Sequence, residues 1–185
     1  LAYTAEVDPC YNAGWEFFVD SDFACNSEPQ NNRRSQTGYI ALLNGAPVMW
    51  SSKVSSVAFA DPRIGDGHAD ISSGAAEVYA AGNASMDFLH LNHVMSEMNI
   101  KFPEPYFLQI DNAAAMTFAK NTASKSRLKH IDCRQEWVHV MRNSSISTPV
   151  HVPTKLNLAD LLTKILPSPR FCELRDRMMH RVPKR

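Results

Sequence analysis

The sequence lacks the long apolar runs, paired cysteines and repeats that mark several protein classes. No stretch approaches the roughly 20 consecutive apolar residues that a membrane-spanning helix requires. The cysteines are widely spaced and form no CxxC pair, which argues against a zinc site and favours reduced thiols; they are Cys10, Cys25, Cys133 and Cys172. No internal repeat or low-complexity tract is present. We therefore expect a globular protein inside the cell, without membrane insertion.

The first residues also lack the features of a targeting signal. Residues 1–8 contain neither a basic region nor an apolar core, and the chain does not begin with Met. We expect the chain to be a processed piece or a fragment of a longer protein.

What the sequence does contain is typical of one α/β domain. The chain has 185 residues, of which 44% are hydrophobic and 21% charged, enough for a sizeable core. We predict an N-terminal extension over 1–14, one domain over 15–167, and a C-terminal helix with a basic tail over 168–185.

The two ends of the chain carry opposite charge although the net charge is zero. Residues 1–119 hold 5 Lys and Arg against 14 Asp and Glu, a balance of −9, and residues 120–185 hold 14 against 5, a balance of +9. This split suits a protein that gathers cations in one place and phosphates in another. Two complementary surfaces of one fold, or a docking face for a protein partner, would explain it equally well.

Hydrophobic periodicity predicts a mixed sheet with helices packed on it. Alternating apolar residues indicate strands over 15–20, 38–43, 47–52, 105–110 and 148–152. Asn44-Gly45 predicts a tight hairpin between the second and third strands. Pro149 indicates that the last strand lies at an edge or begins near that residue. Helical patterns cover 72–98, 112–120, 129–142, 156–166 and 169–179.

Four acidic residues each end or interrupt an apolar stretch: Asp20, Glu77, Asp111 and Asp160. A buried carboxylate is costly unless it is paired, protonated or bound to a cation. Acids that follow adjacent strands would meet at one edge of the sheet, and Glu77 lies on the apolar stripe of the predicted helix 72–98. Two hard cations bridged by carboxylates and a phosphate oxygen would form a two-metal hydrolase site.

Each acid also has an ordinary structural interpretation. Asp111 could cap the helix that follows it, and Asp160 could lie on the solvated side of its helix. Asp20 could accept hydrogen bonds from loop amides, and Glu77 could pair with an Arg at the edge of the core.

Seven ordered segments resemble the ribonuclease H domain of copia-type LTR-retrotransposon (reverse transcriptase) polyproteins. They occupy residues 19–24, 33–39, 45–53, 72–80, 110–115, 129–134 and 152–164. The resemblance is collinear over roughly 15–180. It implies a ribonuclease H-like fold with a five-stranded mixed sheet flanked by helices. It also implies cleavage of the RNA strand of RNA–DNA hybrids with two Mg²⁺ or Mn²⁺ ions.

The resemblance also suggests which residues carry out the reaction. Its four acidic positions match Asp20, Glu77, Asp111 and Asp160, both as catalytic residues and as metal ligands, whereas Asp22 is only a neighbour. The expected contacts to the hybrid are Arg33, Arg34, Lys125, Arg127, Lys129 and His130. The arginine pair could equally lie in a solvated turn, and His130 could equally be a packed structural histidine.

Three departures from the family pattern leave other functions open. Residues 60–71 form a longer link before the Glu-bearing helix, Gly74-Ala75 replaces a more polar pair, and residues 152–160 lack the His of cellular ribonucleases H. The chain could be a domesticated, catalytically retired subunit in a larger protein or ribonucleoprotein assembly. It could also bind nucleic acid without cleaving it.

Overall fold

The computed structural model describes residues 14–23, 35–55, 73–100, 105–120 and 129–179, and the account below concerns these residues. Residues 1–13 of the predicted N-terminal extension, residues 180–185 of the predicted basic tail, and the long link over 60–71 lie outside them. The predicted domain bounds therefore stay predictions.

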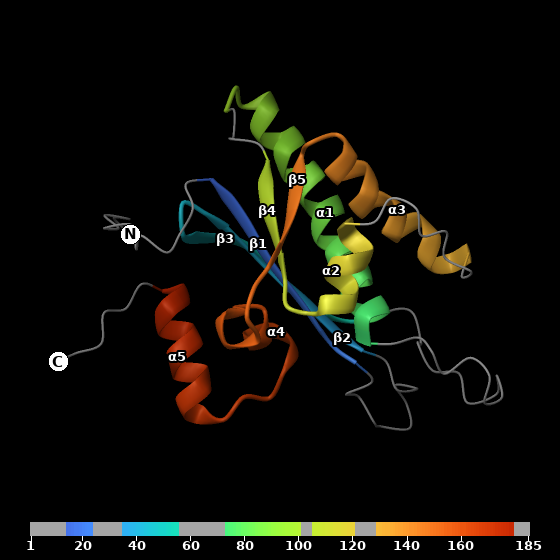
Figure 1. The fold of residues 1–185 in the computed structure, drawn as a ribbon. Coiled ribbons are helices and arrows are strands. Elements are labelled where there is room, and N and C mark those ends of the chain that lie inside the picture. The colour runs from blue at the N-terminus through green and yellow to red at the C-terminus, as the bar shows by residue number, and fades with distance from the viewer. Residues whose placement is uncertain (1–13, 24–34, 56–72, 101–104, 121–128, 180–185) are drawn as a thin grey trace.

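Five strands form one mixed sheet, as expected (Figure 1). They are β1 (Trp15–Asp22), β2 (Gln36–Leu43), β3 (Ala46–Val54), β4 (Tyr106–Ile110) and β5 (Ser147–His151). Their order is β3-β2-β1-β4-β5. β2 lies antiparallel to both β1 and β3, whereas β4 lies parallel to both β1 and β5. The parallel pairing of β1 with β4 brings the carboxyl ends of both strands to the same edge.

Local sequence explains the ends of this sheet. Asn44 and Gly45 both adopt positive φ, at 50° and 79°, which is the conformation of a tight hairpin turn between β2 and β3. Pro149 lies in β5, an edge strand, where a missing N–H donor is tolerated. Both predictions are confirmed.

Helices cover both faces of the sheet (Figure 1). On one face lie α1 (Ser73–Glu97), α2 (Ala113–Lys120) and α3 (Lys129–Asn143), and on the other α4 (Asp160–Thr163) and α5 (Ser168–Met178). Among the described helices, none is long and apolar enough to cross a membrane.

The predicted helix over 156–166 is wrong in its extent. A 3₁₀ turn covers Thr154–Leu156, and α4 holds only Asp160–Thr163. The helix ends at Thr163, and the following Lys164 adopts an extended conformation, with φ −119° and ψ 146°. The buried apolar residues of this stretch pack into the core from a turn and one turn of α-helix. Hydrophobic periodicity alone does not distinguish this arrangement from a longer helix.

Two hydrophobic cores result from the alternation of side chains along the strands. The larger core lies under α1 to α3 and includes Trp15, Phe17 and Phe88, whose rings pack at centroid distances of 5.4–6.0 Å. The smaller core lies under α4 and α5, where Phe18 meets Leu174 and other apolar residues. The sheet is therefore buried on both faces, and its carboxyl edge lies between the two helical layers.

Candidate active site

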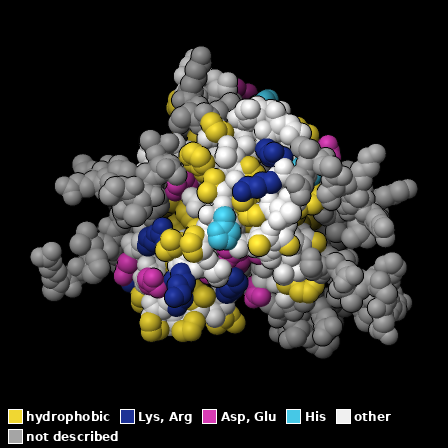
Figure 2. All heavy atoms as spheres, in the orientation of Figure 1, with side chains coloured by type: hydrophobic (Ala, Val, Ile, Leu, Met, Phe, Trp, Pro, Cys, Tyr) yellow, Lys and Arg dark blue, Asp and Glu magenta, His cyan; other side chains and the backbone are white. Residues whose placement is uncertain are grey.

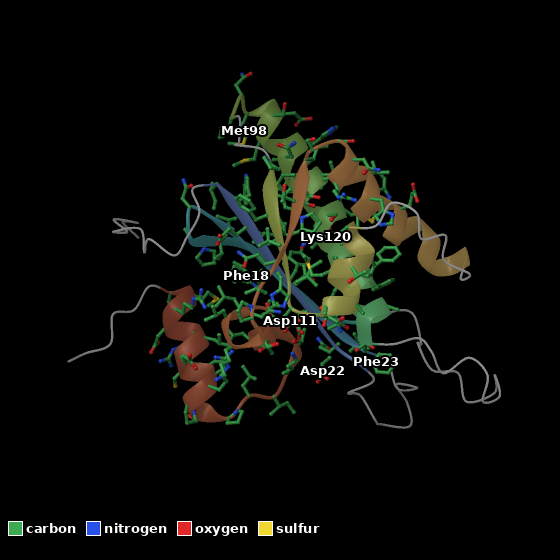
Figure 3. The ribbon with its side chains drawn as sticks, viewed as in Figure 1. Phe18, Asp22, Phe23, Met98, Asp111 and Lys120 are labelled. Carbon is green, nitrogen blue, oxygen red and sulfur yellow. The ribbon has the colours of Figure 1, made fainter. Side chains whose placement is uncertain are left out.

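Three carboxylates from separate elements meet at the carboxyl edge of the sheet. Asp20 belongs to β1, Asp111 follows β4, and Glu77 reaches the same point from the first turns of α1. One oxygen from each lies within 4.8 Å of the other two. Figure 3 shows Asp111 at the end of β4. Because β1 and β4 are parallel neighbours, the approach of Asp20 to Asp111 follows from the sheet topology, whereas Glu77 is brought there by the packing of α1.

Glu77 is the acid least satisfied by the protein. It is buried, and its Oε2 atom has no hydrogen-bond partner among the described residues. Burial, together with the nearby charges of Asp111 and Asp20, raises the pKa of Glu77 to about 9. A buried carboxylate with a free oxygen and two acidic neighbours needs either a proton or an external cation.

Asp111 is not the cap of the helix that follows it. The side chain of Asn112 fills that role, because its Oδ1 accepts hydrogen bonds from the amides of Ala114 and Ala115 at 2.9 and 3.1 Å. The carboxylate of Asp111 is thereby left available to the cluster. The capping interpretation of Asp111 is not what the structure shows.

Asp160 lies beside this cluster rather than within it. It is buried at the start of α4, so it does not lie on a solvated helix face. Its Oδ1 accepts a hydrogen bond from Lys164 Nζ at 2.6 Å, and Arg170 lies 3.8 Å from its other oxygen. The same Lys164 Nζ lies 3.0 Å from Oδ1 of Asp20. One ammonium group thus bridges the acids of β1 and α4.

Asp20 is held by two neighbours on the α4 side. Lys164 contacts one of its oxygens, and the Thr163 hydroxyl donates a hydrogen bond to the other. Burial raises the pKa of Asp20 even though these two contacts oppose the rise. Burial alone would lower the pKa of Lys164, but its bonds to Asp160 and Asp20 outweigh burial and raise it. The loop-amide interpretation of Asp20 is replaced by these contacts to α4.

The close approach of α4 to the sheet depends on Gly38. A Cβ atom at Gly38 would lie 2.8 Å from Thr163 Cγ2 and 2.9 Å from Leu162 Cβ. The Ser52 hydroxyl also donates a hydrogen bond of 2.6 Å to the carbonyl of Leu162, which ties α4 to β3. Asn157 binds the carbonyl of Val19, the residue before Asp20, at 3.0 Å. These contacts bring Asp160 and Lys164 to the carboxyl edge.

The remaining predicted residues lie away from this point or outside the described residues. Asp22 is half-buried near the end of β1 (Figure 3) and is not part of the three-acid cluster. Lys129 and His130 begin α3, but their side chains are not described. Arg33, Arg34, Lys125 and Arg127 lie outside the described residues. The proposed contacts to the hybrid stay predictions.

The basic excess of the C-terminal third is partly paired on the surface. Figure 2 shows Lys and Arg side chains intermingled with Asp and Glu side chains over α4 and α5. Arg170 pairs with Glu173 at 2.9 Å, and Arg175 pairs with Asp176 at 2.7 Å. Part of the charge split in the sequence therefore resolves into local ion pairs within α5.

The sequence reasoning missed Lys164, Thr163 and Gly38 as parts of the site. Lys164 follows Asp160 by four residues, the spacing at which opposite charges meet on a helix, and this signal could have suggested their pairing. Its second contact, to Asp20, spans 144 residues of sequence and has no local signature.

The oxygen donors of the three-acid cluster fit a divalent cation. Hard cations such as Mg²⁺ and Mn²⁺ prefer carboxylate oxygens, and Glu77 Oε2 offers a buried, unpartnered one.

The relatives of this chain in sequence are retrotransposon polyproteins. The Pol polyprotein of transposon TNT 1-94 from Nicotiana tabacum is 28% identical over 154 residues, which cover 83% of this chain and 10% of the relative. That of transposon RE1 from Arabidopsis thaliana is 28% identical over 167 residues, covering 90% of this chain and 10% of the relative. The chain thus spans about a tenth of the length of these relatives. No protein-family model matches it.

Several solved structures with a similar fold are ribonucleases H. LC11-RNase H1, isolated from compost by a metagenomic approach, has a TM-score of 0.55 and 12% sequence identity, covering 82% of this chain and 94% of its own. The N-terminal RNase H domain of rv2228c from Mycobacterium tuberculosis has a TM-score of 0.54 and 11% identity, covering 89% and 98%. LC11-RNase H1 in complex with an RNA/DNA hybrid has a TM-score of 0.52 and 14% identity, covering 80% and 93%. The chain therefore has a ribonuclease H-like fold and resembles the ribonuclease H domain of a retrotransposon polyprotein, as its sequence predicted.

Proposed function

We propose that this chain is a metal-dependent endonuclease that cleaves the RNA strand of RNA–DNA hybrids, and that it derives from a copia-type retrotransposon polyprotein. The observation that supports this most directly is the cluster of Asp20, Glu77 and Asp111 at the carboxyl edge of a ribonuclease H-like sheet. The hybrid is favoured as substrate because LC11-RNase H1, a structural neighbour, has been solved in complex with one.

The acids of the cluster would hold Mg²⁺ or Mn²⁺, and two ions are proposed. Bound divalent ions supply positive charge at the scissile phosphate and lower the pKa of an attacking water. Asp20, Glu77 and Asp111 would bind through their clustered oxygens, and Asp160 would complete the set from α4. The fold sets the position of each acid, because Asp20 lies in β1, Asp111 directly follows β4, and Glu77 and Asp160 lie in helices.

The substrate would be recognised outside the carboxylate cluster. Arg33, Arg34, Lys125, Arg127, Lys129 and His130 are proposed to contact the hybrid backbone or the scissile region. Enzymes that distinguish RNA from DNA use the 2′-hydroxyl groups exposed in the shallow minor groove. The proposed location inside the cell, where such hybrids form, agrees with reduced thiols.

A gel assay with labelled RNA–DNA hybrid and Mg²⁺ or Mn²⁺ tests the proposal. We expect the wild-type protein to cleave the RNA strand and Asp20→Asn and Asp111→Asn to lose cleavage. The loss should exceed the roughly 10- to 100-fold decrease expected when a residue that only hydrogen-bonds to a metal ligand is removed. Asp22→Asn, two residues from Asp20 and outside the cluster, is the matched control and should retain activity. A folded wild-type protein that leaves the hybrid intact with both metals contradicts the proposal.

The alternative function is a catalytically retired subunit in a larger assembly. One observation favours it: the Lys164 ammonium already bridges Asp20 and Asp160, where a cation of the reaction would otherwise be held. This alternative predicts no cleavage by the wild-type protein, together with a stable partner when the native protein is isolated and its mass is measured. Isolation of an active protein without partners excludes it.

A further inference from the structure

We propose that Lys164 is a built-in cation that holds the place of a second divalent ion, so that the protein alone binds one such ion, at Asp20, Glu77 and Asp111. A second ion enters only when the lysine side chain is displaced. This inference rests on the proposed metal-dependent function and specifies how many ions the free site takes.

The geometry of Lys164 supports this assignment. Its Nζ lies 3.0 Å from Asp20 Oδ1 and 2.6 Å from Asp160 Oδ1, so one positive charge already bridges the two acids. The other oxygen of Asp20 accepts a hydrogen bond from Thr163. An ion shared between Asp20 and Asp160 would have to bind within about 2.0–2.1 Å of its oxygens, in the space that the ammonium occupies.

The charges around the site also balance for one ion. With all four acids ionised, Asp20, Glu77, Asp111 and Asp160 contribute four negative charges, and Lys164 and Arg170 contribute two positive ones. The remaining two negative charges match one divalent cation. Neutralising Lys164 leaves three, which favours the binding of a further cation between Asp20 and Asp160.

The backbone of Lys164 is held in place by the packing of α4. Its backbone amide bonds to the carbonyl of Asp160 at 3.1 Å, and its chain then leaves the helix in an extended conformation. Ser52 holds the preceding turn through Leu162, and Gly38 leaves room for Thr163. The side chain is 31% exposed, whereas that of Asp20 is 1% exposed. Because part of the Lys164 side chain reaches solvent, it can move outward and leave Asp20 open to an incoming ion.

Counting bound Mn²⁺ tests the proposal without relying on activity. Isothermal titration of metal-free protein with Mn²⁺, together with electron paramagnetic resonance, measures the number of ions and whether two ions lie close enough to couple. We expect one uncoupled ion in the wild type and two coupled ions in Lys164→Met. Lys164→Arg keeps the positive charge and should bind one ion. Lys155→Met, which removes an exposed lysine from the neighbouring 3₁₀ turn, should also bind one.

Lys164→Gln provides a second neutral variant if Lys164→Met does not fold, and it should also bind two ions. Two ions in the wild type, no ion in the wild type, or no gain in the folded neutral variants each overturn the proposal. The hybrid-cleavage assay reports separately on the proposed function. If the wild type binds one ion and Lys164→Met binds two, but the wild type does not cleave the hybrid, the proposal for Lys164 stands and the proposed nuclease function fails.

Discussion

The candidate active site has two sides that differ in how their acids are paired. On the α1 side, Glu77 and Asp111 lie together without an ion-pair partner among the described Lys and Arg residues. On the α4 side, Asp20 and Asp160 share Lys164. All four acids lie at the same edge of the sheet, yet only the acids on the α4 side are neutralised by a basic side chain of the protein. The first keeps an unpartnered buried oxygen on Glu77.

This difference shows how one site can be both stable and ready to bind a cation. A site in which every acid is paired with a lysine or arginine would fold stably and attract no metal. A site with four unpaired acids would be destabilised by their mutual repulsion. Here α4 supplies the compensation that folding needs, and α1 and β4 supply the donors that a cation needs. The predictions below alter one side at a time.

The largest expected effect is the pH dependence of the metal-free protein, which comes from the α1 side. Glu77 ionises near 4.5 when unfolded and near pH 9 in the native state, so between these values the native state binds the extra proton. The stability that this provides is fully present below pH 4.5 and is lost as pH rises toward 9. Asp20, whose pKa is also raised by burial, contributes in the same direction.

Urea unfolding in the presence of a chelator, at intervals between pH 5 and 8.5, measures this loss. Its slope should approach about 1.4 kcal/mol per pH unit, the value for one proton. Glu77→Gln should remove most of the slope, and saturating Mn²⁺ should flatten it because the bound ion keeps the carboxylate charged. A stability that is constant or rising over this range in metal-free protein contradicts the assignment.

The next largest effect should follow removal of the cation on the α4 side. Lys164→Met leaves Asp20 and Asp160 buried without their shared partner. The free energy of unfolding of the metal-free variant should therefore be lower by about 3 kcal/mol. This value lies near the lower end of the range for a broken buried ion pair, because the lysine side chain is partly exposed. Added Mn²⁺ should recover more stability in this variant than in the wild type. Denaturant midpoints with and without the ion measure both quantities, and an equal metal response would show that the two sides are independent.

A somewhat smaller effect is expected from the contact that joins the two sides. Gly38→Ala places a methyl group 2.8–2.9 Å from Thr163 and Leu162, so α4 must move away from β2. Overpacking of this kind costs about 1–3 kcal/mol. Denaturant unfolding measures the cost. The substitution Ser52→Ala, which removes only the hydrogen bond to Leu162, serves as the milder comparison. Wild-type stability in Gly38→Ala would mean that α4 tolerates displacement.

The smallest effect should come from Arg170, the second cation of the α4 side. Its guanidinium lies 3.8 Å from Asp160, farther than Lys164. Arg170→Met should therefore lower the free energy of unfolding by less than about 1 kcal/mol, the range for partly solvated ion pairs. A loss as large as that of Lys164→Met would transfer the main neutralising role to Arg170.

Much of the fold could be predicted because it depends on local patterns. Alternating apolar residues identified the strands, and Asn44-Gly45 identified their hairpin through the positive φ that these two residues tolerate. The predicted helix over 156–166 failed for the opposite reason. Its apolar residues satisfy the core from a short turn, and the extended conformation of Lys164 that ends α4 accompanies contacts to distant strands.

The candidate site divides in the same way. The sequence by itself indicated which acids end or interrupt apolar stretches, Asp20 and Asp111 among them, since a charge after an apolar run is a local signal. Only the tertiary structure decided that Glu77 keeps a free oxygen and that Lys164 bridges two acids, one of them 144 residues away. The physical reason is that ion pairing and burial depend on which surfaces meet, and Gly38 controls that meeting through the absence of a single carbon atom.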